Sequence, residues 1–155
     1  MIRYFIIGSF LIFLAGCLNP PDYSVIPAIT FDSISSTTAR VGFDSITFLI
    51  DFTDGDGDLG SSDVPNLFFR DSRTGYTDSF KIPNLTPEGN VKAISGVISY
   101  VYAGSSFSCT PPPGRTFDTL HYTIYVEDRA GNKSNEIITP QIILQCQWSS
   151  LYCRK

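Results

Sequence analysis

The sequence predicts an all-β domain in which two sheets pack face to face, and two observations support this. No stretch after residue 17 shows apolar residues at a sustained helical period. Several segments instead alternate apolar and polar residues, as in the series Ile46, Phe48, Ile50 and Phe52. Alternation gives each strand one face for a core and one face for solvent, which is what a sandwich of two sheets requires.

Turn signals divide the domain into seven predicted strands, which cover residues 28–35, 44–53, 66–71, 78–82, 91–102, 118–127 and 135–145. Seven short strands of this kind are typical of an immunoglobulin-like or fibronectin-like sandwich, and a small barrel is the alternative. Pro140 interrupts the last strand, so this strand is expected at a sheet edge or at a bulge.

The first residues predict an exported protein. In residues 1–16 one basic side chain precedes an apolar run that is too short to span a bilayer comfortably, which favours a signal peptide over a retained anchor. The run ends in Leu-Ala-Gly-Cys, which resembles the bacterial lipobox and implies cleavage before Cys17 and acylation of Cys17. Residues 17–27 are then a proline-rich tether, 28–146 the sandwich domain and 147–155 a C-terminal tail.

The charge of the processed chain limits its partners. Without residues 1–16 the chain has ten Lys and Arg against fifteen Asp and Glu, a formal charge of −5. This charge argues against a nucleic-acid partner and against a domain that lies on anionic lipid. We therefore expect contact with the membrane through the N-terminal lipid alone, and an unidentified protein or glycan partner.

Three cysteines follow the predicted lipidation site. An exported chain meets an oxidising compartment, so one disulfide and one unpaired thiol are expected. A zinc site is disfavoured because six residues separate Cys146 from Cys153 and the single histidine, His121, lies far away in sequence. Strand order predicts the pair Cys109–Cys146, because the fifth strand ends, and the seventh strand returns, at the same end of the domain. The pair Cys109–Cys153 is the alternative.

An acidic segment after the second predicted strand is the main candidate site. Asp54, Asp56 and Asp58 alternate like the first three ligands of an EF-hand calcium loop. Leu59 then occupies the position of the required glycine, and Pro65 occupies the position of the twelfth-residue glutamate, so an EF-hand proper is not expected.

The predicted topology offers further calcium ligands. In an immunoglobulin-like strand order the acidic loop and the hairpin 126–135 lie at one end of the sandwich. Asp128 and Asn132 of that hairpin could then complete a Ca²⁺ shell begun by the three aspartates. An ion-free turn is the alternative, because Asp-Gly pairs form turns readily. Three adjacent carboxylates nevertheless repel one another unless a cation or water screens them.

Hairpin 126–135, with the sequence VEDRAGNKSN, resembles the last hairpin of many bacterial immunoglobulin-like domains. Together with the lipobox and the acidic loop, it makes the chain similar to small single-domain lipoproteins of the Bacteroidota. This resemblance implies a fold and an outer-membrane location rather than a reaction. It also favours the periplasmic leaflet, because no acidic cluster directly follows Cys17.

The expected function is a non-catalytic binding or structural module, stabilised by calcium. No serine or cysteine has a recognisable base partner nearby in the sequence. The alternative is a cell-envelope hydrolase that acts on glycans or peptides. A glycosidase would need a pair of carboxylates, and fifteen acidic residues distributed over β-loops do not reveal which two would form it.

Overall fold

The computed structural model of the chain describes residues 21–85 and 92–146. The predictions for the signal peptide 1–16, for Cys17 and for the tail 147–155 with Cys153 lie outside the described residues. The described part is all-β, with one short 3₁₀ turn. Its elements are β1 (Ala28–Ile34), β2 (Thr38–Arg40), β3 (Ile46–Asp54), β4 (Leu67–Asp71), β5 (Thr77–Phe80), β6 (Ile94–Tyr102), η1 (Gly104–Ser106), β7 (Phe117–Leu120), β8 (Tyr122–Val126), β9 (Ile137–Ile138) and β10 (Ile142–Gln145).

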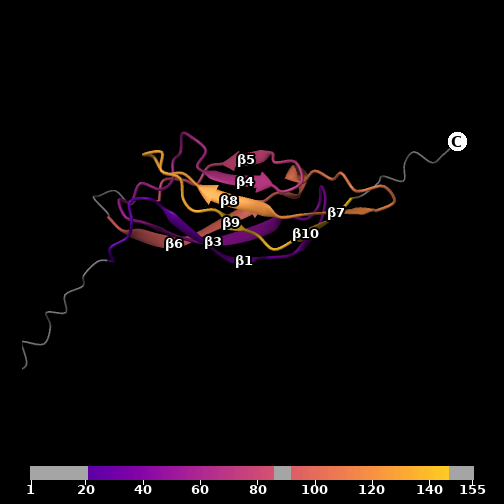
Figure 1. Cartoon of the computed structure of the whole chain (residues 1–155), viewed down its shortest axis with the longest axis horizontal. Helices are drawn as coiled ribbons and strands as arrows, with labels where there is room; N and C mark the ends of the chain where they lie inside the picture. Colours follow the sequence, from indigo (N-terminus) through magenta and orange to yellow (C-terminus); the bar gives the residue numbers. More distant parts are fainter. Residues whose placement is uncertain (1–20, 86–91, 147–155) are drawn as a thin grey trace, which may run out of the picture.

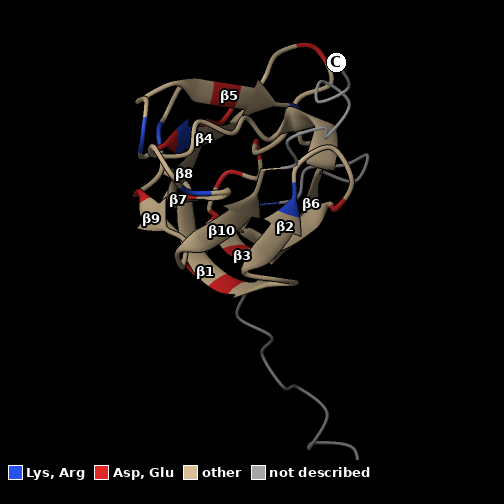
Figure 2. Cartoon of the chain, turned by 90° about the vertical axis from the view of Figure 1, so that its right-hand side faces the viewer, with Lys and Arg blue, Asp and Glu red and all other residues tan. Residues whose placement is uncertain are grey.

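The strands form three sheets. One has the order β1-β3-β6, the second β5-β4-β8-β9, and the third β2-β10-β7. All pairs are antiparallel except β2 with β10, which is parallel. The side view separates β4, β5 and β8 from β1, β3 and β6 (Figure 1). In the end-on view, β5, β4, β8 and β9 follow one side of the domain, while β1, β3 and β6 follow the other (Figure 2).

The core lies between these two sides and confirms the predicted alternation. Along β3 the residues Ile46, Phe48, Ile50 and Phe52 are buried, and the intervening side chains are more exposed. Phe69 of β4 is completely buried against an aromatic cluster from both sides of the domain, which comprises Phe48, Phe80, Tyr100, Tyr102 and Tyr122. Each fully buried apolar side chain contributes about 1.5–3 kcal/mol, so this cluster is a principal source of stability.

The described residues form ten strands rather than the seven predicted. The predicted strand 118–127 is divided at His121, where the chain changes partners: β7 pairs with β10, whereas β8 pairs with β4 and β9. The predicted strand 135–145 is divided around Pro140, which has no N–H to donate to a ladder. The remaining addition is β2, whose three residues are too few to show alternation.

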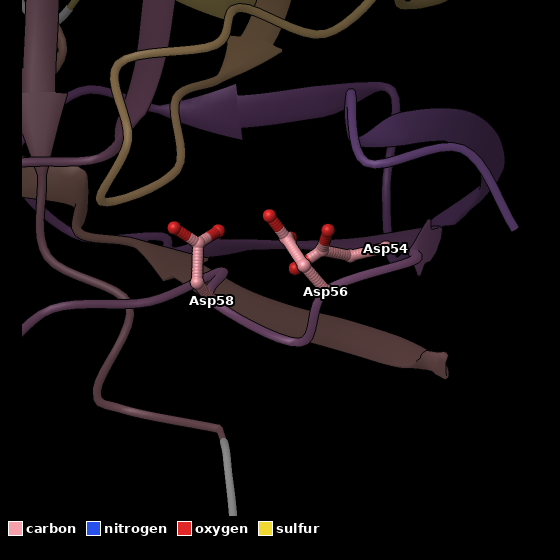
Figure 3. Close-up of side chains that lie close together, drawn as sticks. All are labelled: Asp54, Asp56 and Asp58. Atoms are coloured by element: carbon pink, nitrogen blue, oxygen red, sulfur yellow. The ribbon is translucent and has the colours of Figure 1, made fainter. Parts of the chain in front are cut away.

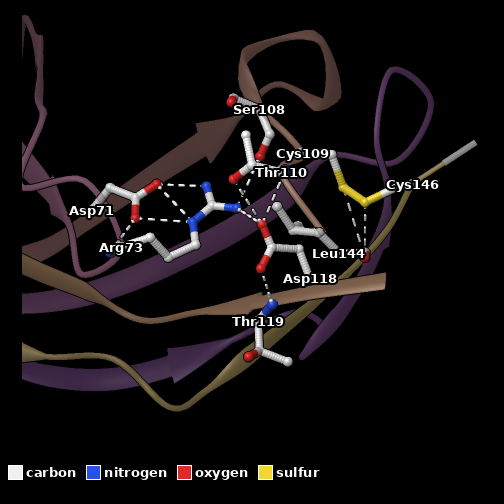
Figure 4. Close-up of a disulfide and its surroundings, with 9 residues drawn as sticks. All are labelled: Asp71, Arg73, Ser108, Cys109, Thr110, Asp118, Thr119, Leu144 and Cys146. Atoms are coloured by element: carbon white, nitrogen blue, oxygen red, sulfur yellow. Dashed lines mark hydrogen bonds and ion pairs between the residues drawn. A yellow bond between two sulfur atoms is a disulfide. The ribbon is translucent and has the colours of Figure 1, made fainter. Parts of the chain in front are cut away.

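Two covalent and ionic links hold the end of the domain at which β7 and β10 lie (Figure 4). A disulfide joins Cys109 to Cys146, with their Cα atoms 5.8 Å apart, and this is the pairing that strand order predicts. Next to it the guanidinium of Arg73 lies between the carboxylates of Asp71 and Asp118. The β4–β5 turn, the β6–β7 connection and β10 are thereby fixed to one another.

A search of residues 21–85 and 92–146 for a helix of the length and apolar character needed to cross a bilayer found none.

Candidate functional site

The acidic loop begins inside the core. Asp54 is the last residue of β3. It follows Phe52 by two residues, so its side chain lies on the same inward face of the strand, and it is 0% exposed. Its Oδ2 accepts a hydrogen bond from the backbone N–H of Leu59, at 2.8 Å. Its Oδ1 is buried and has no hydrogen-bond partner. Leaving a buried polar atom unpaired costs about 1–3 kcal/mol, and more if the group is charged.

Three carboxylates converge in this loop. One oxygen each of Asp54, Asp56 and Asp58 lies within 4.8 Å of the others. The three side chains project from the loop toward the same side (Figure 3). Oδ1 of Asp58 is also buried without a partner, and the oxygens on Asp54 and Asp58 are the two such side-chain atoms in the described part of the chain.

The backbone of the loop turns sharply and then packs closely. Gly57 has φ +72° and Gly60 has φ +94°, a region that favours glycine. At Gly60 a Cβ would lie 2.3 Å from the carbonyl oxygen of Pro83, so no other residue fits there without a backbone shift. Leu59 between them is completely buried and holds the returning chain against the core.

The loop contacts the hairpin between β8 and β9, which confirms that the two lie at one end of the domain. The backbone N–H of Arg129 donates to the carbonyl oxygen of Asp58 at 3.4 Å, and the N–H of Ala130 donates to its Oδ2 at 3.1 Å. The guanidinium of Arg129 donates to Gly60 O and to Asn84 Oδ1, each at 3.0 Å. These guanidinium bonds end on neutral oxygens.

Asp128 lies outside the group of carboxylates that the three aspartates form, and it bonds Asn132 instead, so the role of these two residues as ligands stays a prediction. Oδ1 of Asp128 accepts from the backbone N–H of Asn132 at 2.7 Å, and Oδ2 accepts from its side-chain Nδ2 at 2.8 Å. Asp128 thus uses both carboxylate oxygens to close its own turn, a local bond that aspartate forms readily. Its charge still acts on the loop, since it contributes to raising the pKa of Asp58.

Burial and mutual repulsion disfavour ionisation at this site. Burial, followed by the proximity and charge of Asp56 and by the charge of Asp58, raises the pKa of Asp54 to about 6. The N–H of Leu59 acts in the opposite direction. Burial is also the main cause of the raised pKa of Asp58. A nearby cation would reverse these effects by stabilising the ionised carboxylates.

The chain that enters the domain lies against the same loop. The N–H of Gly55 donates to the carbonyl oxygen of Ser24 at 2.8 Å, and its carbonyl oxygen accepts from the N–H of Ala93 at 2.9 Å. A Cβ at Gly55 would lie 2.2 Å from the carbonyl oxygen of Tyr23. The position of the loop is therefore coupled to that of the preceding tether.

These residues fit a hard divalent cation. Calcium binds six to eight oxygens, and carboxylates on a short flexible loop supply them well. Here three carboxylates converge and two of them have a buried oxygen without a partner. Sequence reasoning found all three aspartates but not the burial of Asp54. The alternation along the strand would have predicted this burial, because Asp54 lies two residues after the inward-facing Phe52.

Comparisons of this chain with family models, with curated proteins and with solved structures gave no match. The resemblance to Bacteroidota lipoproteins therefore stays a prediction.

Proposed function

We propose that this protein is a membrane-tethered, non-catalytic binding or structural module whose acidic loop binds Ca²⁺ and thereby stabilises the fold. One observation carries the calcium proposal. Oδ1 of Asp54 and Oδ1 of Asp58 are buried without hydrogen-bond partners, in a loop where both carboxylates and that of Asp56 lie within 4.8 Å. A bound cation would satisfy these oxygens and cancel the repulsion among the three charges.

The strand order supports an immunoglobulin-like sandwich. When each divided strand is counted once, the first, second and fifth predicted strands form one sheet, represented by β1, β3 and β6. The other sheet has the order β5-β4-β8-β9, which contains the fourth, third, sixth and seventh predicted strands. This is the division between sheets of an immunoglobulin-like domain, with the fourth strand beside the third.

The tether places the acidic loop close to the proposed anchor. Acylation at Cys17 would place the lipid seven positions before Ser24, whose carbonyl oxygen accepts a hydrogen bond from the N–H of Gly55 in the loop. Seven residues reach at most about 25 Å. On this proposal the calcium loop faces the outer membrane, in the periplasmic leaflet, and the opposite end of the domain is available to partners.

The hydrolase alternative gains no support from the carboxylates that share a cavity at that opposite end, Asp71 and Asp78. A catalytic acid needs a raised pKa. The pKa of Asp71 is instead lowered, because bonds from Arg73 outweigh its burial. Both of its oxygens accept from that guanidinium, and one oxygen of Asp78 accepts from the hydroxyl of Tyr102. We therefore retain the binding module as the proposed function.

Thermal unfolding of the chain from residue 18 onward tests the calcium proposal. An ion that binds only the folded state stabilises it by RT ln(1 + [Ca²⁺]/Kd), about 2.7 kcal/mol at a hundredfold excess over Kd. Extracellular modules of this kind have Kd values on the order of 0.1–1 mM. The melting temperature should therefore rise between chelator and several millimolar calcium, and rise less with magnesium, which demands a stricter octahedral geometry.

A double variant separates ion binding from general charge effects. Asp56→Asn with Asp58→Asn should abolish the calcium response and should melt above the wild type in chelator, because the repulsion is removed. The matched control is Asp32→Asn with Asp51→Asn, which makes the same charge change at two exposed positions and should keep the response. A wild-type melting temperature that calcium leaves unchanged would contradict the proposal.

A further inference from the structure

A second candidate site lies at the far end of β3 from the acidic loop. Residue Ile46, at the start of β3, pairs with Tyr102, whereas Asp54, at its end, pairs with Ile94. Nine extended residues separate the two ends by about 27 Å. Beside Tyr102 the structure has a cavity of about 260 Å³, between the β4–β5 turn and the connection from β6 to β7.

The floor of this cavity is rigid and aromatic. Tyr102 is 1% exposed and Tyr122 is 2% exposed. Tyr102 stacks on Phe107 with ring centroids 4.9 Å apart, and it contacts Tyr122 at 5.3 Å. Its hydroxyl donates to Oδ2 of Asp78 at 2.5 Å. Burial raises the pKa of Tyr122 to about 12, so the floor offers neutral phenols and one fixed carboxylate.

The surrounding charges make the cavity electronegative. Arg73 donates to both oxygens of Asp71, to Oδ2 of Asp118 and to the carbonyl oxygen of Ser108 (Figure 4). The Arg73 guanidinium forms ion pairs with two carboxylates, so Arg73, Asp71 and Asp118 together carry one net negative charge. Asp78 adds a second charge, and no Lys or Arg is among the described residues that line the cavity. Repulsion therefore disfavours an anionic ligand.

The rim supplies the remaining recognition groups. Tyr76 lies in the β4–β5 turn and is 68% exposed. Across the mouth, Ser106 and Ser108 are exposed and carry hydroxyls. An aromatic face, a carboxylate and hydroxyl acceptors together suit a cation, because the ring quadrupole attracts positive charge and the oxygens accept its N–H donors.

We propose that this cavity binds a primary ammonium group, with Asp78 as its counter-ion and Tyr76 as its aromatic wall. The ammonium belongs either to a small free amine or to a lysine side chain of a peptide. The cavity, at about 260 Å³, is smaller than the about 300–1,000 Å³ of sites for drug-sized molecules, which suits a short aliphatic amine or a single side chain. This site depends neither on calcium nor on the membrane anchor.

Titration of the full chain in detergent, followed by amide NMR shifts, tests this site. The probes are n-butylamine, a tripeptide with one central lysine, and 1-pentanol as the neutral molecule of similar shape. Both amines should shift the amides of residues 74–78 and 104–108 saturably, and the effect should weaken as salt rises. Tighter binding of the tripeptide would identify a peptide ligand, and tighter binding of butylamine a free amine.

Two variants keep the proposal falsifiable. Asp78→Asn retains an oxygen that can accept from the Tyr102 hydroxyl, and its affinity for the amines should fall at least tenfold. The control is Asp51→Asn, which makes the same charge change on an exposed face of β3 and should leave the amine affinity unchanged. Tyr76→Ala, at an exposed position, should weaken binding severalfold. Three outcomes overturn the proposal: pentanol binding as well as butylamine, Asp78→Asn binding unchanged, or no shift at tens of millimolar amine. Each is independent of the calcium response, so the two proposals fail separately.

Discussion

Replacing Asp54 by asparagine should change how stability depends on pH. In calcium-free protein, burial and its acidic neighbours raise the pKa of Asp54 to about 6, from an ordinary value of 3.8. Between these two pH values the folded chain holds more protons than the unfolded chain. The corresponding stability is complete below pH 3.8 and is lost as the pH rises through about 6.

The magnitude follows from the two pKa values. Their separation, at 1.36 kcal/mol per pKa unit, corresponds to about 3 kcal/mol in total, of which about 2 kcal/mol falls between pH 4.5 and 7.5. Asp71 and Asp118 have lowered pKa values, so their contribution is complete above their ordinary pKa of 3.8 and does not vary in this window. Glu136, whose pKa is lowered from 4.5 by bonds from Lys133 and Arg70, adds stability as the pH rises at the lower edge of the window, so a fall in stability with rising pH reports on the acidic loop.

Urea unfolding in chelator at four pH values between 4.5 and 7.5 measures the effect. The wild type should lose about 2 kcal/mol across this range, and Asp54→Asn should lose less than 1 kcal/mol and be the more stable protein at pH 7.5. Saturating calcium should reverse that order, because only the wild type keeps the buried charge that the ion neutralises. Asp51→Asn, on the exposed side of β3, is the control and should follow the wild type. Wild-type stability that stays flat or rises with pH in chelator would refute this reasoning.

Three further variants test other parts of the chain. Arg73→Met leaves two buried carboxylates unpaired and should cost about 3–5 kcal/mol in urea unfolding at pH 7, and less at pH 4; an equal cost at both pH values would contradict the ionic explanation. Cys109→Ser with Cys146→Ser opens a link between residues 37 positions apart and should cost about 2–4 kcal/mol in the same assay, whereas unchanged stability would show that this link does not form. Cys17→Ser should release the chain from membranes in fractionation, or leave an uncut precursor, and normal processing with retained membrane binding would exclude lipidation.

Local alternation was enough to predict the core and one part of the site. The period of two in β3 correctly predicted which side chains are buried, because a strand between two neighbours has one face on the core. Carried to the end of the strand, the same period brings Asp54 inward. The loop–hairpin contact followed from strand order, since the acidic loop and the β8–β9 hairpin leave the same end of the domain.

Features that depend on competition between partners were not predictable. Asp128 could have turned toward the loop, but Asn132 lies four residues away and occupies both of its oxygens. At His121, where β7 ends and β8 begins, the N–H donates to the hydroxyl of Ser72 and the carbonyl oxygen accepts from the Ser72 N–H, a partner 49 residues away in sequence that extends the β4–β8 pairing. The distant cavity was missed for the same reason: Asp78 of β5 meets the hydroxyl of Tyr102 of β6, 24 residues away, only because the two sheets that hold these strands pack against each other.

The burial of Asp54 is the strongest reason to assign the acidic loop a function. An apolar residue at the inward end of β3 would continue the core and remove the cost of an unpaired buried carboxylate oxygen. A turn alone requires only the glycines and one aspartate that bonds its own backbone, as Asp54 does through the N–H of Leu59. The two further carboxylates, at Asp56 and Asp58, destabilise the ion-free fold by raising the charge around a buried acid. Their convergence on a buried acid therefore supports our proposal of a ligand that needs negative oxygens, and Ca²⁺ meets that requirement.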